Sequence, residues 1–371
     1  MNLTLRTLLY LLLAASMATG LSAQAHSDPA GVWKFAISGD SRNCGDIVMP
    51  AIAAHVRADG AVFYWHLGDF RAIYNIDEDY ASIHPQSSMA HYLNEAWPDF
   101  IQHQLAAFGD VPVFLGIGNH ELGPPMSRAD YLAQFADWLN SAVISGQRLA
   151  DDPASHIMRT YYHWIERGVD FISMDNASTD MFDRGQLDWL TMVLNNAAKN
   201  DAVQSVVVGM HEALPDSLSA GHSMNESGQE TASGRIAYAE LSAFRSRTKK
   251  KVYVLASHSH FVMNNVYDTA CHKDDVLPGW ITGTAGAQRY RLPADLGAST
   301  IHQTDVYGYL LATVSSDGTI IFEFKPIQRS DLPARVTQEF PAKVVDYCFT
   351  SNDSTSQPNG PSCGTSGTAR K

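Results

Sequence analysis

The chain has 371 residues, a formal net charge of −13 at pH 7 and 45% hydrophobic residues. This apolar content is enough for a sizeable core. The acidic surplus argues against nucleic acid or an anionic membrane as a bulk partner, because both need a basic surface. Small phosphorylated substrates stay open, since bound metal ions can reverse the local field.

The first 25 residues have the pattern of a secretory leader. Arg6 supplies positive charge, Leu8–Ala18 is an apolar run, and Ser22–Ala25 ends in an A-x-A pattern, so we expect cleavage after Ala25. The apolar run is too short to span a bilayer as a stable helix. The sequence therefore predicts a soluble protein without a membrane span, secreted or periplasmic.

The four cysteines are Cys44, Cys271, Cys348 and Cys363. Export permits disulfides, and four cysteines allow three pairings. Cys348 and Cys363 bracket a stretch rich in Ser, Asn, Pro and Gly. We expect a local bridge between those two and a second bridge between Cys44 and Cys271.

The chain is expected to divide into a leader (1–25), a catalytic domain (26–345) and a polar C-terminal tail (346–371). Strands are expected at Val32–Asp40, Ala61–Asp69, Val111–Gly118, Tyr161–Ile165, Val169–Met174, Ser205–His211, Val252–His260, Phe261–Tyr267, Trp280–Thr284, Tyr307–Val314 and Thr319–Phe324. Helices are expected at Ile47–Arg57, at Tyr80–Phe108 with interruptions near Pro85 and Pro98, and at Tyr131–Val143, Gln186–Asn195 and Ile236–Ser246. This alternation indicates an α/β fold, in which sites gather at the carboxyl ends of the strands.

Five of the expected strands end in residues that can bind a metal. These residues are Asp40, Asp69, Asn119 with His120, His211, and His258 with His260. One such residue alone is explained by turn chemistry or by a backbone partner, but five strand ends in succession point to a shared site. His258 and His260 stand two residues apart, so in a strand both would leave the same face.

Carboxylate, amide and imidazole donors together suit first-row metals such as Mn, Zn, Fe or Co. Two such ions about 3.5–4 Å apart can hold a hydroxide and clamp both oxygens of an in-line displacement. We therefore expect two divalent or trivalent ions. His120 would face the substrate and protonate the leaving group, while Glu121 is expected to act as a supporting acceptor.

The order of these motifs resembles the calcineurin-like metallophosphoesterase superfamily. The matching segments are Gly39-Asp40, Gly68-Asp69, Gly118-Asn119-His120-Glu121, Met210-His211 and Ser257-His258-Ser259-His260. The resemblance implies an α/β fold of two packed mixed β-sheets flanked by helices, a four-layer αββα sandwich. It also implies one metal on Asp40 and His260, another on Asn119, His211 and His258, a bridging Asp69, and His120 as the catalytic acid.

The first motif departs from the superfamily pattern. Many relatives have Asp-x-His there, and that histidine binds a metal, whereas this chain has Asp40-Ser41-Arg42. Arginine stays protonated and cannot coordinate a metal. Either this metal has fewer protein ligands or another group fills in. Arg42 itself would hold phosphate oxygens or form a salt bridge at the rim of the site.

Two further features of the sequence concern a possible resemblance to the purple acid phosphatase branch of this superfamily. The tyrosine that these enzymes place three residues after the bridging aspartate is Ala72 here, and the nearest tyrosine is Tyr74. Gly221–Glu226 resembles a region whose histidine touches substrate in those enzymes, which makes His222 a candidate substrate-binding residue. The alternative for His222 is a place in a polar loop.

The leading hypothesis is an exported metal-dependent phosphoesterase, with phosphomonoesters favoured, a metal-bridging hydroxide as nucleophile and His120 as general acid. A phosphodiesterase or nucleotidase is the first alternative. The sequence does not choose between these activities, because loops at 74–99 and 122–152 would set substrate choice. The second is a non-catalytic metal-binding module of the same fold. The intact His120 counts against that module, and Arg42 in place of a ligand counts for it.

Overall fold

The computed structural model describes residues 31–177, 181–219, 221–225 and 228–350. The expected leader, Cys363 and the part of the expected tail after residue 350 lie outside these residues. Nowhere in the described ranges is there a helix with the length and apolarity needed to cross a membrane.

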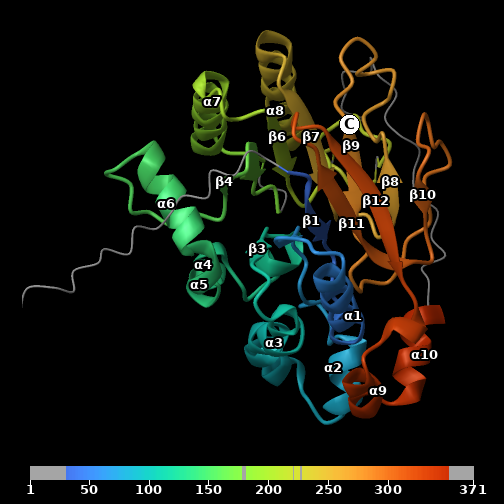
Figure 1. Ribbon diagram of the computed structural model, residues 1–371. Helices are drawn as coiled ribbons and strands as arrows, with labels where there is room; N and C mark the ends of the chain where they lie inside the picture. Colours follow the sequence, from blue (N-terminus) through green and yellow to red (C-terminus); the bar gives the residue numbers. More distant parts are fainter. Residues whose placement is uncertain (1–30, 178–180, 220, 226–227, 351–371) are drawn as a thin grey trace, which may run out of the picture.

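Two mixed β-sheets form the centre of the molecule (Figure 1). The five-stranded sheet has the order β12-β11-β1-β2-β3, with β1 (Trp33–Ser38), β2 (Tyr64–His66), β3 (Val113–Leu115), β11 (Tyr307–Val314) and β12 (Ile320–Ile327). The seven-stranded sheet has the order β10-β8-β9-β7-β6-β5-β4, with β4 (Tyr162–Glu166), β5 (Val169–Ser173), β6 (Ser205–Gly209), β7 (Lys251–Ala256), β8 (Val262–Asn264), β9 (Gly279–Thr282) and β10 (His302–Gln303). The predicted fold class is therefore confirmed.

Within each sheet the strands that lead to the site run parallel. In one sheet β1 pairs with β2 and β2 with β3, and in the other β5, β6, β7 and β9 follow one another in parallel. The carboxyl ends of parallel strands share one edge of a sheet. This arrangement brings the polar strand ends of both sheets to the same edge of the sandwich.

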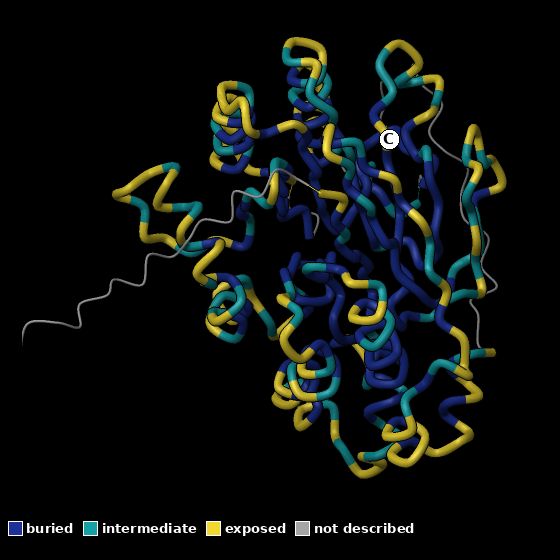
Figure 2. Tube along the Cα trace, viewed as in Figure 1, coloured by how far each residue is buried: buried dark blue, intermediate teal, exposed yellow. Residues whose placement is uncertain are grey.

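Aromatic side chains fill the space between the two sheets. Phe35 of β1 meets Phe171 of β5 edge to face, with ring centroids 4.9 Å apart. Phe114 of β3 stacks on Trp164 of β4 at 3.9 Å. Such pairs contribute about 0.5–1.5 kcal/mol each beyond the burial of their area. The dark central strands in Figure 2 show this buried interior.

Helices cover the outer faces of the sheets. Side chains of α1, α9 and α10 pack with β1, β2 and β11, whereas α7 and α8 pack with β6 and β7. The helices are α1 (Gly45–Ala58), α2 (Glu78–Ile83), α3 (Met89–His103), α4 (Arg128–Gln134), α5 (Ala136–Leu139), α6 (Ala142–Asp151), α7 (Arg184–Lys199), α8 (Gly228–Thr248), α9 (Ala334–Glu339) and α10 (Ala342–Thr350), with 3₁₀ turns η1 (Leu105–Phe108), η2 (Asn119–Leu122) and η3 (Arg329–Asp331).

Two helix predictions need correction. The break near Pro85 is present between α2 and α3, but Pro98 lies inside α3 without ending it. A proline removes one backbone donor, and the packing of a helix can outweigh that loss. The expected helix at Tyr131–Val143 is divided among α4, α5 and α6, with breaks at Phe135 and at Asn140–Ser141.

Both disulfide predictions are wrong. Cys44, at the start of α1, is bonded to Cys348 in α10, across 304 residues of sequence. Cys271 is disulfide-bonded as well. Pairing by sequence proximity fails here because α10 packs into the same apolar cluster as α1, so that Cys44 and Cys348 are both buried there.

The strand expected at Val252–His260 is also too long. β7 ends at Ala256, and Ser257–His260 form a turn in which His258 has a φ of +61°. His258 and His260 therefore do not reach one site by strand alternation, as had been expected from their spacing. The turn instead sends them to different partners.

Candidate metal centre

The centre lies where β1, β2, β3, β6 and β7 end. Asp40, Asp69 and His258 all have left-handed backbone conformations, with φ of 59°, 60° and 61°. This region is uncommon for residues other than glycine, and such strain concentrates at functional sites. The abrupt turns point these side chains across the ends of the sheets.

Two glycines of the motifs are required by close packing. A Cβ on Gly118 would overlap the Oδ1 of Asp69, and a Cβ on Gly68 would overlap the backbone of Gly118. Gly68 also has a φ of 96°, which residues with a side chain rarely adopt. The two glycines let the turns after β2 and β3 touch each other, which places Asp69 beside Asn119.

One cluster of side chains has the geometry of a metal site. Potential ligand atoms of Asp69, His211 and His258 all lie within 4.8 Å of one another. The Nε2 of His211 lies 3.3 Å from the Oδ1 of Asp69, 3.0 Å from the Nδ1 of His258 and 3.0 Å from the Oδ1 of Asn119. The other ring nitrogen of His211 hydrogen-bonds the carbonyl oxygen of Leu67 at 2.9 Å, which orients the ring.

Unsatisfied carboxylate oxygens show that these residues fit a cation. In the described structure the Oδ2 of Asp69 and the Oδ1 of Asp40 are buried without a hydrogen-bond partner. A buried carboxylate oxygen without a partner is costly unless it is neutralised. Two imidazoles, an amide and a carboxylate together suit a first-row metal ion.

The electrostatics of the cluster depend on Asp69. Burial opposes protonation of His211, but the Asp69 carboxylate raises the pKa of His211 to about 10. Burial and the neighbouring His211 lower the pKa of His258 well below its usual value. Without a metal, a proton on His211 therefore balances Asp69, and an ion that binds here displaces that proton.

Asp40 and His260 form the other half of the centre. The Oδ2 of Asp40 accepts hydrogen bonds from the Ser257 hydroxyl and from the backbone N–H of His258, the latter at 2.7 Å. Its Oδ1 lies 3.2 Å from the Nε2 of His260.

Arg42 reaches into this half of the centre. One terminal nitrogen, Nη2, lies 3.2 Å from the Nε2 of His260 and donates to the hydroxyl of Tyr290 at 3.2 Å. Its Nε lies 3.8 Å from the Oδ2 of Asp69. The Arg42 side chain is 14% exposed. A salt bridge, one of the two roles expected for Arg42, is therefore possible here with Asp69, but inside the site and not at its rim.

His120 lies against the Asp69 carboxylate. Its backbone N–H donates to the Oδ1 of Asp69 at 2.9 Å, and its Nε2 lies 3.7 Å from Oδ2. The ring Nδ1 hydrogen-bonds the carbonyl oxygen of Ala72. The ring of Tyr74 meets His120 edge to face at 5.0 Å, although Tyr74 is 60% exposed.

An aromatic stack borders the centre. The ring of Tyr290 lies 3.8 Å from that of His260 and 4.8 Å from that of His222, nearly parallel to both. The ring of His222 is also 5.1 Å from that of His258. The structure thus brings His222 to the centre together with the eight other predicted site residues. Tyr290 was not predicted, since it follows His260 by 30 residues and belongs to none of the motifs.

A second group of possible ligands lies outside the strand-end cluster. It consists of Asp46, Asp99 and His103. The buried Arg71 forms ion pairs with Asp46 at 2.7 Å and with Asp99. The guanidinium already supplies the positive charge that these carboxylates need.

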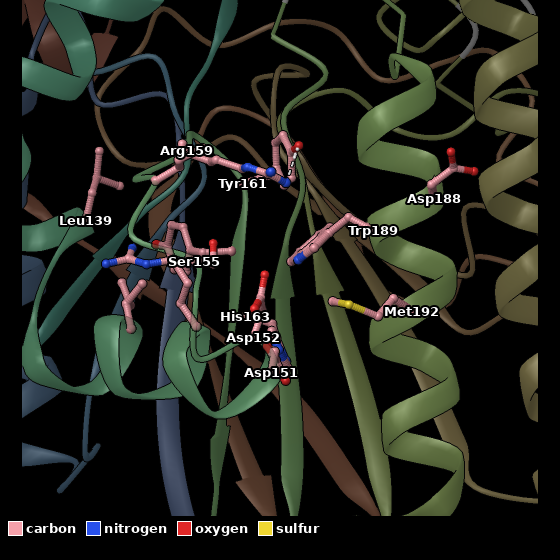
Figure 3. A pocket seen from close by; sticks show the side chains of 14 residues that line it. Leu139, Asp151, Asp152, Ser155, Arg159, Tyr161, His163, Asp188, Trp189 and Met192 are labelled. Atoms are coloured by element: carbon pink, nitrogen blue, oxygen red, sulfur yellow. Dashed lines mark hydrogen bonds and ion pairs between the residues drawn. The ribbon is translucent and has the colours of Figure 1, made fainter.

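A cavity of about 260 Å³ lies between α6, β4 and α7 (Figure 3). Asp151 and His163 lie close together in it, and Trp189 and Met192 project from α7. None of its lining residues is one of the predicted site residues. The cavity is therefore separate from the candidate metal centre.

No protein-family model and no curated protein matches the chain. Solved structures do match. A purple acid phosphatase from yellow lupin (Lupinus luteus) seeds superposes with a TM-score of 0.55 and 15% identity over 80% of this chain and 52% of its own. PhoD matches with a TM-score of 0.50 and 13% identity over 77% of this chain and 64% of its own.

A dimetal phosphatase from Danio rerio matches with a TM-score of 0.50 and 12% identity, over 79% of this chain and 96% of its own. The chain spans about half the length of the lupin enzyme and 64% of PhoD. At these identities the likeness concerns the fold. It confirms the predicted resemblance at that level: this chain has the fold of metal-dependent phosphatases.

Proposed function

We propose that the protein is a metal-dependent phosphoesterase, with phosphomonoesters as the favoured substrates. The observation that carries this proposal is the convergence of Asp69, Asn119, His211 and His258, with an unsatisfied oxygen of Asp69 facing His120. Most buried carboxylate oxygens are hydrogen-bonded, so an oxygen without a partner among imidazole and amide groups that can bind a metal supports a cation site.

In this proposal Asp69, Asn119, His211 and His258 hold a metal ion, which we expect to be Mn, Zn, Fe or Co. A bound ion of this kind supplies a Lewis acid and an activated water at neutral pH. His211 is oriented by the Leu67 carbonyl and Asp69 by the His120 amide, so the donors are aligned before binding.

His120 is the proposed general acid. Its Nδ1 is tied to the Ala72 carbonyl, which leaves Nε2 directed toward Asp69 and the space beside it. From there Nε2 can donate a proton to the departing alkoxide. Burial lowers the pKa of His120, and Asp69 opposes that change. An anionic neighbour thus helps His120 keep the proton that it donates.

Arg42 and His222 are the proposed substrate-binding residues. Arg42 supplies a cation next to the site, and His222 flanks it on the side of His258.

We also propose that the protein is exported. The buried Cys44–Cys348 disulfide supports this, because disulfides persist in oxidising compartments.

The proposal is tested by removing bound metal with a chelator, restoring Mn, Zn, Fe or Co, and measuring hydrolysis of p-nitrophenyl phosphate and bis(p-nitrophenyl) phosphate. Turnover of the monoester that depends on added metal is expected, and Asp69→Asn should abolish both metal uptake and turnover. Faster turnover of the diester would favour the phosphodiesterase alternative. Metal uptake without turnover of either ester would leave the metal-binding module as the better description.

A further inference from the structure

We propose that Arg42 takes the place of the second metal ion, so that the centre holds one ion beside a guanidinium. The inference rests on the proposed function in one respect, namely that Asp69, Asn119, His211 and His258 bind a metal. It concerns the half of the centre formed by Asp40 and His260, where the superfamily resemblance implies another ion.

The lone pair that a second ion would need is already used. The Nδ1 of His260 hydrogen-bonds the carbonyl oxygen of Gln288 at 2.6 Å, and a carbonyl can only accept. In the neutral ring the proton therefore sits on Nδ1, and Nε2 carries the lone pair. The Oδ1 of Asp40, 3.2 Å from the same Nε2, can only accept and leaves that lone pair to a donor or a metal ion. Arginine is always a donor, so Arg42 donates to this lone pair across 3.2 Å. A metal ion would need the same lone pair at about 2.0–2.1 Å.

Other residues hold Arg42 in this inward position. The Tyr290 hydroxyl accepts from Nη2 at 3.2 Å, and the Oδ1 of Asn43 accepts from Nη1 at 3.3 Å. Tyr290 itself stacks with the rings of His260 and His222. Holding a guanidinium at three points leaves it little freedom to swing out.

The remaining donors are too few for a second site. Arg42 stands where the superfamily pattern has a ligating histidine, and it has no lone pair to offer. Among the described residues at the strand ends, the one group of three ligands within 4.8 Å is Asp69, His211 and His258. Among the described residues, Asp40 and His260 therefore have no third ligand other than Asp69, and Asp69 already belongs to the other site.

Arg42 can also do part of the second ion's work. Its Nε is buried without an acceptor in the described structure and lies 3.8 Å from Asp69 Oδ2. An unpaired donor beside the metal ligands fits an anionic oxygen of the substrate. A guanidinium binds phosphate oxygens through directed N–H groups. The centre would thus pair one Lewis acid with an arginine that neutralises the phosphate.

The number of bound ions tests this inference independently of activity. The metal-stripped protein is loaded with Mn²⁺ and freed of excess metal; the metal is then counted by plasma mass spectrometry, and its electron paramagnetic resonance spectrum is recorded. The wild type should hold one ion per chain with the spectrum of an isolated Mn²⁺. Arg42→His restores the Asp-x-His pattern and should hold two ions with the spectrum of a spin-coupled pair.

Arg42→Lys is the matched control, since lysine keeps the charge and should leave the count at one. His260→Ala should also leave one ion in place, because that ion is held by the other half of the centre; the wild-type count keeps the test decisive if Arg42→His does not fold. Two spin-coupled ions in the wild type would overturn the inference. A count of one without phosphoesterase turnover would instead contradict the proposed function and leave the assignment of Arg42 intact.

Discussion

The Glu121 carboxylate holds the turn that carries Asp69. Its Oε2 accepts the backbone N–H of Asp69 at 2.9 Å and that of Gly118 at 2.7 Å, and its Oε1 accepts that of Phe70 at 2.8 Å. Burial and the neighbouring Asp69 raise the pKa of Glu121 to about 8, while the three amides act in the opposite direction. Glu121 is therefore the supporting acceptor expected from the sequence, and it joins the turns after β2 and β3.

Glu121→Gln should weaken both the fold and metal binding. The amide oxygen of Gln can accept the two N–H groups that Oε2 accepts, but its NH2 group then faces the N–H of Phe70. A buried donor left without an acceptor costs about 1–3 kcal/mol. We expect the free energy of unfolding, measured in urea, to fall on the order of 2 kcal/mol. Loss of such support for a ligand typically lowers metal affinity about 10–100-fold. Glu323→Gln, at an exposed position on β12, is the control; unchanged Mn²⁺ affinity in a folded Glu121→Gln protein would contradict this role.

His120→Ala should slow the reaction without loss of metal. General acid catalysis typically contributes about 10²–10⁴-fold. The effect should be larger for alkyl phosphates than for p-nitrophenyl phosphate, because nitrophenolate leaves without protonation. Metal content should stay at the wild-type value, since the backbone N–H that contacts Asp69 is kept. The exposed His91→Ala serves as control, and loss of metal in His120→Ala would identify His120 as a ligand.

Peptide mapping of the unreduced protein should recover Cys44 and Cys348 in one linked fragment. The double variant Cys44→Ser, Cys348→Ser should be less stable in urea by about 2–5 kcal/mol, because the bridge restricts the unfolded chain over a long loop. Recovery of Cys44 linked to Cys271 would contradict the disulfide described above.

His163 should make stability depend on pH. Burial opposes its protonation, but Asp151 at 2.6 Å and Asp170 at 2.8 Å raise the pKa of His163 to about 9. In the unfolded chain a histidine titrates near 6.5. The stabilisation is therefore complete below about pH 6.5 and is lost as the pH rises through about 9.

This loss amounts to on the order of 3 kcal/mol. Urea unfolding at pH 6 and pH 9.5 should show the decrease in the wild type and a clearly smaller one in His163→Gln. His156→Gln, an exposed histidine nearby, should behave like the wild type. Equal decreases in the wild type and in His163→Gln would show that this cluster does not govern the pH dependence.

The α/β fold and the positions of the candidate ligands follow from the sequence alone. Buried strands ending in Gly-Asp, Gly-Asn-His or a lone histidine are local patterns, since a short apolar run and a tight turn depend on neighbouring residues. Parallel pairing then brings such ends to one edge of a sheet. This is why Asp40, Asp69, Asn119 and His211 could be predicted as one cluster.

Only the tertiary structure decided how the two halves of the centre differ. The turn at Ser257–His260 directs His258 toward Asp69 and His211, and His260 toward Asp40 and Arg42. Tyr290, which holds Arg42 inward, and Cys348, which meets Cys44, come from distant parts of the chain. Contacts of this kind depend on how helices and sheets pack against one another. Packing leaves no local sequence pattern, so a partner hundreds of residues away cannot be identified from the sequence.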